Sequence, residues 1–172
     1  MHAYCIYGQS SHCKSMAETL EKIGAMRAFS PQVTQFRWKS GKQQSVVYRD
    51  LLPGYVFAFY EEKLKSFQSF YALDGFISKV GDKTMNYELC GQDLDFALCL
   101  YDQDGVMKTV HAHWEGNFVV LDDPLLKRCQ AEVIQMEKRR RRAKIQFEFE
   151  NVTFTTWIAL EIDAIGKDEP VL

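Results

Sequence analysis

The 172-residue sequence has no continuous apolar stretch approaching the ~20 residues needed to span a bilayer, which excludes a transmembrane helix. Its first residues carry no basic segment followed by an apolar one, so we expect no signal peptide and a cytoplasmic location. Neither charge sign dominates, because 21 Lys and Arg against 23 Asp and Glu give a net charge of −2. This balance excludes a generic basic DNA-coating protein. With 47% hydrophobic and 26% charged residues, the composition is that of a globular protein.

The sequence also lacks the spacings typical of metal and catalytic sites. Its cysteines are odd in number and include no Cys-x-x-Cys pair, which argues against a disulfide framework; they are Cys5, Cys13, Cys90, Cys99 and Cys129. His111 and His113 share one face of an extended segment, but two ligands do not make a metal site. Gly-rich phosphate loops, Gly-x-Ser-x-Gly and His-Glu-x-x-His are missing. We therefore expect reduced thiols, no metal or cofactor, no catalytic residue and no enzyme.

Hydrophobic periodicity predicts alternating strands and helices in the first hundred residues. Strands are expected at 3–7, on both sides of a loop at 39–42, at 55–60 and at 76–80, with helices at 10–23, 62–72 and 90–101. In the first helix one buried stripe is expected from Cys13, Met16, Ala17, Leu20 and Ile23. Gly24 then follows as a helix-ending glycine. The pattern is typical of a mixed α/β sandwich.

The rest of the chain predicts strands only, at 117–121, 131–136, 143–149, 152–158 and 160–162. Over 143–149 apolar and polar residues alternate strictly, so one face of that strand is expected to be buried. Asp102-Gln103-Asp104-Gly105 breaks the preceding helical pattern. We therefore predict an α+β protein, with an α/β domain at 1–103, a linker at 104–113 and a small five-stranded β-barrel at 114–168.

Aromatic residues are concentrated on the expected strands at 3–7 and 55–60. They are Tyr4, Tyr7, Tyr55, Phe57, Phe59 and Tyr60. Tyr55, Phe57 and Phe59 share one face of their strand, and Val56 and Ala58 share the other. The small apolar face fits a packed helix, whereas the three aromatic rings need a different cover. The rings are therefore either core residues or an exposed apolar concavity that binds a partner helix.

The charge is uneven along the chain, because six of the seven positions at 138–144 are basic. They are Lys138, Arg139, Arg140, Arg141, Arg142 and Lys144. One interpretation is a solvated surface turn, and the other is a patch that contacts phosphates. The near-neutral total charge does not choose between them.

Two ordered motifs resemble the NusG family of transcription factors. Tyr4-Cys5-Ile6-Tyr7 is similar to the first strand of that family's N-terminal domain, and Leu52-Pro53-Gly54-Tyr55-Val56-Phe57 resembles its Phe-Pro-Gly-Tyr-aliphatic-aromatic segment. Val119-Val120-Leu121-Asp122-Asp123-Pro124-Leu125 resembles the KOW motif. Arg141-Arg142-Ala143-Lys144-Ile145 and Leu160-Glu161-Ile162 resemble the KOW hairpin and closing strand. The resemblance covers nearly the whole chain and is closest to specialised antiterminators of the LoaP and RfaH type.

The resemblance implies an N-terminal α/β domain followed by an SH3-like KOW barrel, in a transcription elongation and antitermination factor. It implies that Tyr7, Tyr55 and Phe57 line an apolar concavity that docks on the clamp helices of the RNA polymerase β′ subunit and suppresses pausing or termination. The family's KOW barrel contacts a small-subunit ribosomal protein, Rho or RNA, and the basic run at 138–144 would suit RNA phosphates. Nascent RNA or non-template DNA is a further implied partner; we expect no membrane partner and a monomer.

Three positions depart from the family pattern. Asp123 replaces the KOW glycine before proline, Ala131 replaces a second glycine, and Lys79 stands where phenylalanine is common. Aspartate tolerates positive φ better than most residues, so we expect the KOW turn to persist, and we expect Lys79 to reduce the apolar pocket. The alternation over 143–149 favours β structure over the helical hairpin of RfaH-type relatives. The alternative function is a KOW-type RNA-binding or ribosome-associated module without a polymerase role.

Overall fold

The computed structural model describes residues 1–81 and 86–163. Its N-terminal part is built on a four-stranded sheet of order β2-β5-β1-β6, in which neighbouring strands are antiparallel. These strands are β1 (His2–Gly8), β2 (Arg27–Phe29), β5 (Tyr55–Tyr60) and β6 (Phe76–Val80). The accompanying helices are η1 (Ser10–His12), α1 (Cys13–Lys22), α2 (Gln68–Tyr71) and α3 (Gly91–Asp102). The expected strands at 3–7, 55–60 and 76–80 and the helices at 10–23 and 90–101 are confirmed.

Helix α1 covers one face of this sheet. Its stripe of Cys13, Met16, Ala17 and Leu20 is buried against the sheet residues Ile6, Val56 and Ala58, as the small apolar face of β5 predicts. Ile23 lies just beyond the helix and is 49% exposed, so it does not belong to the buried stripe. Gly24 follows with a φ of +122°, which confirms it as the helix-ending residue.

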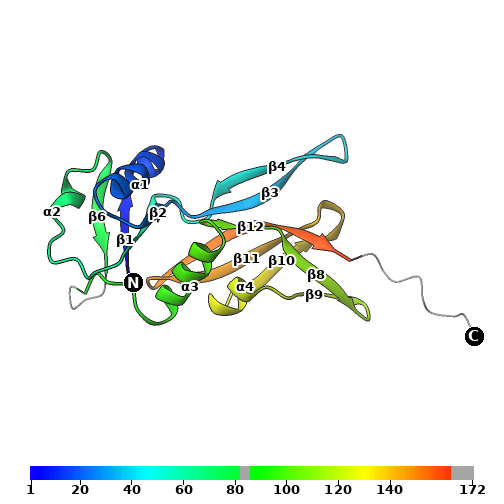
Figure 1. Cartoon of the computed structure of the whole chain (residues 1–172). Helices are drawn as coiled ribbons and strands as arrows, with labels where there is room; N and C mark the ends of the chain where they lie inside the picture. Colours follow the sequence, from blue (N-terminus) through cyan, green and yellow to red (C-terminus); the bar gives the residue numbers. More distant parts are fainter. Residues whose placement is uncertain (82–85, 164–172) are drawn as a thin grey trace, which may run out of the picture.

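A long hairpin projects from the N-terminal part (Figure 1). It consists of β3 (Gln32–Lys39) and β4 (Lys42–Asp50), joined at Ser40 and Gly41, both of which have positive φ. This geometry confirms the predicted loop at 39–42. Strand β7 (Val106–Met107) pairs with β3 in parallel and completes a three-stranded sheet of order β4-β3-β7.

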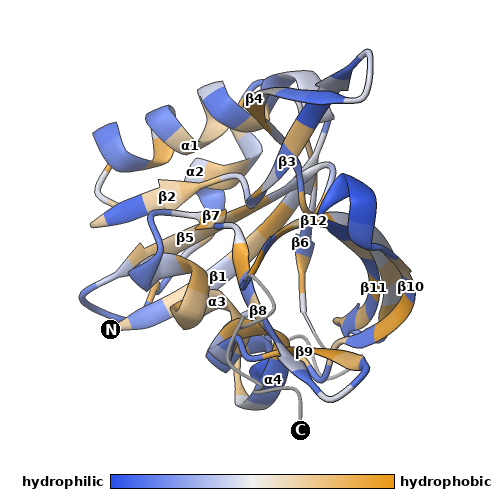
Figure 2. Ribbon diagram, turned by 90° about the vertical axis from the view of Figure 1, so that its right-hand side faces the viewer, coloured by the Kyte–Doolittle hydropathy of each residue, from blue (hydrophilic) through white to orange (hydrophobic). Residues whose placement is uncertain are grey.

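The C-terminal part is a curved five-stranded sheet of order β10-β11-β12-β8-β9 (Figure 2). Its strands are β8 (Val110–Glu115), β9 (Phe118–Leu121), β10 (Glu132–Glu137), β11 (Arg142–Phe149) and β12 (Val152–Ile162), with η2 (Lys138–Arg140) between β10 and β11. The alternation predicted for 143–149 is confirmed, since Ala143, Ile145, Phe147 and Phe149 are all buried. β12 is one continuous strand rather than two. An N-terminal α/β part is thus followed by a strand-rich C-terminal part, as the α+β prediction requires.

The expectation of an all-β C-terminal part is wrong at one place, helix α4 (Pro124–Arg128). Asp123 does not take the positive φ of the glycine it replaces, because its φ is −133°. Its carboxylate instead accepts hydrogen bonds from the backbone N–H groups of Leu125 and Leu126, at 2.8 and 3.1 Å. Asp123 is therefore the N-cap of a short helix, and Pro124 occupies the first helical position, where proline is favoured.

Two other expectations differ from the structure. The helix expected at 62–72 is reduced to the four residues of α2, and the segment expected as a linker at 104–113 contains β7 and the first four residues of β8. The expected barrel end at residue 168 lies outside the described residues. The division of the chain into domains stays a prediction.

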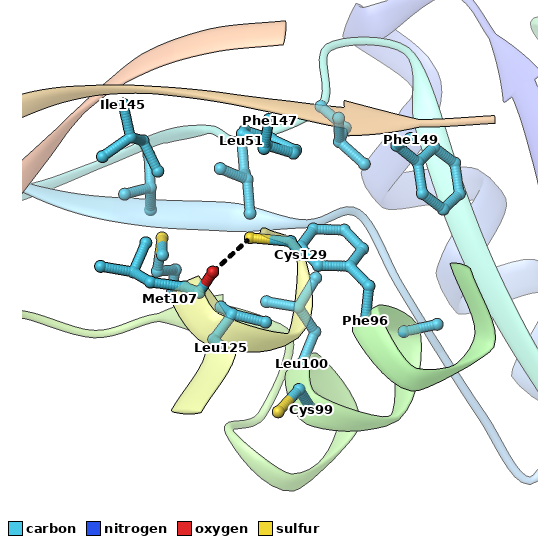
Figure 3. Close-up of a cluster of buried hydrophobic side chains, with 14 of the residues drawn as sticks. Leu51, Phe96, Cys99, Leu100, Met107, Leu125, Cys129, Ile145, Phe147 and Phe149 are labelled. Atoms are coloured by element: carbon cyan, nitrogen blue, oxygen red, sulfur yellow. Dashed lines mark hydrogen bonds between the residues drawn. The ribbon is translucent and has the colours of Figure 1, made fainter. Parts of the chain in front are cut away.

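One hydrophobic core joins the two parts (Figure 3). Phe96 and Leu100 of α3 face Leu125 of α4 in this cluster, and Leu51 enters it from the loop before β5. Strand β11 completes it with Ile145, Phe147 and Phe149. The C-terminal sheet is therefore packed against the N-terminal part rather than held away from it.

Candidate functional site

The first candidate surface is the aromatic face of β1 and β5. Tyr7 and Tyr55 are directly opposite each other in the antiparallel pair, and their ring centroids lie 5.1 Å apart. Gly54, with a φ of +89°, makes this approach possible, since a Cβ there would lie 2.6 Å from the Cε2 atom of Tyr7. The Pro53-Gly54 turn therefore positions both tyrosine rings.

Strands β11 and β12 cover much of the rest of this face together with helix α3, whose Phe96 ring lies 6.3 Å from Phe57. The Phe149 ring lies 5.3 Å from Phe57 and 5.8 Å from Tyr55, both edge-to-face, and Phe154 of β12 lies 5.7 Å from Tyr55. Phe57 is 0% exposed and Tyr55 is half-buried, whereas Tyr7 is 37% exposed. Burial also raises the pKa of the Tyr55 hydroxyl. The structure brings the three predicted polymerase-binding residues together, but in this arrangement Tyr7 is the most exposed of them and Phe57 is closed to solvent.

Polar contacts hold the C-terminal sheet in this position. The backbone N–H of Glu150, in the β11–β12 turn, donates to the carboxylate of Asp93 on α3 at 3.2 Å. Burial raises the pKa of Asp93, and this hydrogen bond partly opposes the rise. On β3, the side-chain amide of Gln35 donates to the carbonyl of Trp157 at 2.9 Å. Two contacts therefore hold β11 and β12 over Phe57. The Asp93 contact fixes the β11–β12 turn to α3, and the Gln35 contact fixes the middle of β12 to β3.

Lys79 does not reduce an open apolar pocket as expected. Its ammonium group lies 4.2 to 5.2 Å from the ring centroids of Phe67, Tyr71 and Tyr87, and it donates to the Tyr71 hydroxyl at 2.9 Å. The lysine therefore makes cation–π contacts with three rings beside β6, which is favourable for a partly buried cation.

The second candidate surface is the basic turn between β10 and β11. Lys138, Arg139, Arg140 and Arg141 are exposed, and Arg142 and Lys144 are half-buried, so all six predicted RNA-binding residues lie around one turn. Arg141 has a φ of 46°, a left-handed conformation that costs a non-glycine residue ~1–2 kcal/mol. In residues 1–81 and 86–163, no carboxylate forms an ion pair with Arg139 or Arg141.

Two tryptophans hold the ends of this basic turn. The ammonium of Lys138 lies 4.5 Å from the ring centroid of Trp114, and the guanidinium of Arg142 lies 4.1 Å from that of Trp157. Arg142 also donates two hydrogen bonds to Glu137, at 2.9 and 3.0 Å, and these hold the pKa of Glu137 below its usual range. Trp114 and Trp157 were missed by sequence analysis, because no local pattern links them to residues 138 and 142.

The described residues contain no group of three or more His, Cys, Asp or Glu that could hold a metal ion. His111 and His113, considered as ligands above, each contact a carboxylate instead: Asp163 at 3.2 Å and Glu115 at 3.2 Å. In the described part of the chain, no helix is long and apolar enough to cross a membrane.

Comparison with known proteins gives one family. A family model described as NusG, transcription termination factor nusG, matches residues 1–94, which is more than half of the chain and includes β1 through the start of α3. A comparison with curated proteins gave no match.

Proposed function

Because the chain belongs to the NusG family, whose members act in transcription elongation and termination and interact with RNA polymerase, we propose that it is an antitermination factor that docks on the β′ clamp helices. Factors of this family are not enzymes. The docking residues are Tyr7, Tyr55 and Phe57. The observation that carries the proposal is that these three aromatic residues share one face of β1 and β5 within the matched segment.

The chemistry of the face suits an α-helical partner. Amphipathic helices bind by laying an apolar stripe into an apolar surface, and rings such as Tyr55 and Phe57 supply large contact areas. Phe149 occupies that area in the described structure, so a partner helix reaches Phe57 only after β11 moves away. Tyr7, which is already exposed, is the first residue that the partner meets.

Docking acts by position rather than by bond chemistry. A factor that binds the clamp helices and bridges to the opposite lobe of the polymerase holds the clamp closed, which disfavours the open states that accompany pausing and termination. The turn at 138–144, whose residues 138–141 are exposed in the described arrangement, is the surface of the C-terminal sheet that would contact RNA. A small-subunit ribosomal protein or Rho is the other candidate partner of this sheet.

The second candidate function is a KOW-type RNA-binding or ribosome-associated module without a polymerase role. The observation that favours it is the exposed β10–β11 turn, where Arg139 and Arg141 form no ion pair with any described residue. The two functions differ in what the aromatic face is for, because in the second one Phe57 and Tyr55 are core residues only.

The test is binding of the full chain to a peptide that carries the clamp helices. We expect Tyr7→Ala and Tyr55→Ala each to weaken binding about tenfold, the effect of removing a ring from a binding centre. Phe149→Ala should strengthen binding, because it loosens the cover over Phe57 and Tyr55. Phe57→Ala is less informative, because Phe57 belongs to the core and its loss destabilises the fold.

The matched control is Tyr48→Ala, which removes a tyrosine that is 60% exposed on the β3–β4 hairpin, away from the aromatic face. Unchanged clamp-helix affinity in the Tyr7 and Tyr55 variants would show that the docking surface lies elsewhere. If neither the wild type nor the Phe149 variant binds the helices while RNA binding is retained, the second function is correct.

A further inference from the structure

The tip of the β3–β4 hairpin carries a second set of cations. Arg37, Lys39 and Lys42 are exposed there, and the only acidic residue of the hairpin, Asp50, lies at the opposite end of β4. In residues 1–81 and 86–163, the side chains of these three cations make no ion pair, hydrogen bond or cation–π contact. The hairpin tip is thus a cationic surface whose three charged side chains are not neutralised by any described residue.

The hairpin tip and the β10–β11 turn project from the same end of the molecule. Strand β3 lies against β12, where Gln35 donates to the carbonyl of Trp157, and Arg142 covers the ring of the same tryptophan. From Gln35, β3 continues four residues to the tip at Lys39, a distance of roughly 13 Å at strand spacing. Figures 1 and 2 both place the end of the β3–β4 hairpin and the turn between β10 and β11 at the same end of the molecule, and Figure 2 colours much of both as hydrophilic.

The two cationic elements together gather nine of the 21 Lys and Arg of the sequence. Glu137, which directly precedes the turn, is already engaged, because it forms ion pairs with Arg140 and Arg142. A protein with a net charge of −2 therefore has one strongly positive end, which attracts polyanions.

We propose that the hairpin tip and the β10–β11 turn form one continuous track for a single-stranded nucleic acid. Lys39, Lys42 and Arg37 bind its phosphates, and Arg139, Arg140 and Arg141 bind phosphates and stack on its bases. A single strand fits better than a duplex, because η2 is too short to act as a recognition helix, whereas guanidinium planes stack readily on unpaired bases. This inference rests on the nucleic-acid contact proposed above for the turn and extends it to the N-terminal part.

The track needs both parts of the chain in their described arrangement. Gln35 and Trp157 join β3 to β12, and neither cationic element reaches the other without that contact. A nucleic acid bound along the whole track therefore favours the arrangement in which Phe149 covers Phe57.

The test measures binding of the full chain to an oligonucleotide of about 12 nucleotides, by fluorescence anisotropy over a salt series. The hairpin variant carries Arg37→Gln, Lys39→Gln and Lys42→Gln. Single strands release about 0.7 counterion per phosphate contact, so the slope of log affinity against log salt should become shallower by about 2. The matched control, Lys14→Gln with Lys22→Gln and Lys65→Gln, changes the same charge at exposed positions elsewhere and should keep the wild-type slope.

A turn variant separates this inference from the function on which it rests. It carries Arg139→Gln, Arg140→Gln and Arg141→Gln, and it should also flatten the salt slope. If the turn variant loses affinity while the hairpin variant behaves like the lysine control, the contact at the turn stands and the track is wrong. If the turn variant also behaves like the control, the nucleic-acid contact itself is wrong.

Oligonucleotide length and type complete the test. An oligonucleotide of about 4 nucleotides covers only one element, so the hairpin substitutions should affect it much less than the longer one. An equal effect on both lengths would indicate two separate sites and overturn the track. RNA and DNA of the same sequence identify the source of the strand, since a preference for RNA requires contacts to the 2′-hydroxyl. Duplex DNA that binds as tightly as the single strand would overturn the single-strand assignment.

Discussion

The two faces of the β2-β5-β1-β6 sheet are covered in different ways. On one face, α1 follows β1 almost directly in the chain and buries Ile6, Val56 and Ala58 beneath aliphatic side chains. On the other face, Phe57 lies beneath Phe149 of β11, which is far later in the chain and belongs to a different sheet. The first cover is local and aliphatic, and the second is remote and aromatic.

This difference separates a face whose cover is purely structural from a face whose cover, β11, could be replaced by a partner under the proposed function. The short connection between β1 and α1 keeps the helix close to the sheet at little entropic cost, so that face opens only when the protein unfolds. The cover over Phe57 contacts the sheet by its side chains without joining it by backbone pairing. Under the proposed function, an apolar partner helix offers the same kind of contact and replaces β11 without rebuilding the sheet.

The largest expected effect comes from removing the remote cover. Phe149→Ala deletes the ring that contacts Tyr55, Phe57 and Phe96, and we expect the free energy of unfolding to fall by about 3–5 kcal/mol. Urea denaturation monitored by tryptophan fluorescence measures this change. Phe118→Ala is the control, since Phe118 is 76% exposed and its loss should cost under about 0.5 kcal/mol.

Leu20→Ala on the α1 face sharpens this result, because it should lower stability by about 2–5 kcal/mol without uncovering Tyr55. Only the Phe149 variant should bring the raised pKa of Tyr55 back toward its usual value, as followed by phenolate absorbance. If both variants change the Tyr55 titration equally, the two faces do not open independently.

The next largest expected effect is the loss of stability at alkaline pH, which we compare for one tyrosine on each face of the sheet. Burial raises the pKa of Tyr60, on the α1 face, to about 12. The unfolded chain loses this proton near pH 10, so the stabilisation is complete below that pH and is lost as pH rises from about 10 to 12. At pH 11 the wild type should have lost about 1 kcal/mol that Tyr60→Phe does not lose, in urea titrations at each pH.

Tyr55→Phe is the partner experiment on the remote face. The pKa of Tyr55 is raised by burial in the same direction, but its side chain is only half-buried, so its alkaline loss should be smaller than that of Tyr60. An equal or larger loss at Tyr55 would mean that the remote face is as closed to water as the α1 face.

The smallest effect concerns helix α4, which packs on α3 beside the remote cover. Asp123→Ala removes the N-cap that accepts from Leu125 and Leu126, and we expect a loss of about 1 kcal/mol in thermal or urea unfolding. Asp122→Ala is the control at the neighbouring position, where the exposed ion pair to Lys127 is screened by solvent and should contribute much less than the cap. If the two substitutions cost the same, the carboxylate of Asp123 does not act as a cap.

Local elements were predictable where a short stretch repeats a pattern. The apolar stripe of α1 and the alternation of β11 were both predictable from the sequence, since each depends on residues only two to four positions apart. Helix α4 could not be predicted from the sequence, because five residues are too few to show helical periodicity. Asp123 also stands at a position where the KOW motif has glycine, which favours a turn over a helix N-cap. Most of the helix expected at 62–72 is not formed: Leu64 and Phe67 pack against the N-terminal core from outside α2, and Tyr71 is 62% exposed.

The candidate surfaces divide in the same way. The six cations at 138–144 are consecutive enough to be recognised from the sequence, and β10 and β11 place them on one turn. Arg37 and Lys42 belong to no notable run, so only the packing of β3 against β12 reveals them as neighbours of that turn. Trp114 and Trp157 gain their contacts with Lys138 and Arg142 in the same manner.

Residue type and short-range spacing are enough to predict which face of β5 is aromatic, where the basic turn lies and that the chain resembles NusG factors. Three-dimensional packing, in contrast, determines that Phe57 is buried and Tyr7 is exposed, although both lie on the same face of the β1–β5 pair. Strand alternation specifies the side of a sheet on which a residue points, but not what covers that side. The cover over Phe57 includes Phe149 of β11 and Phe96 of α3, and contacts between residues so far apart in the chain leave no periodic trace in the sequence.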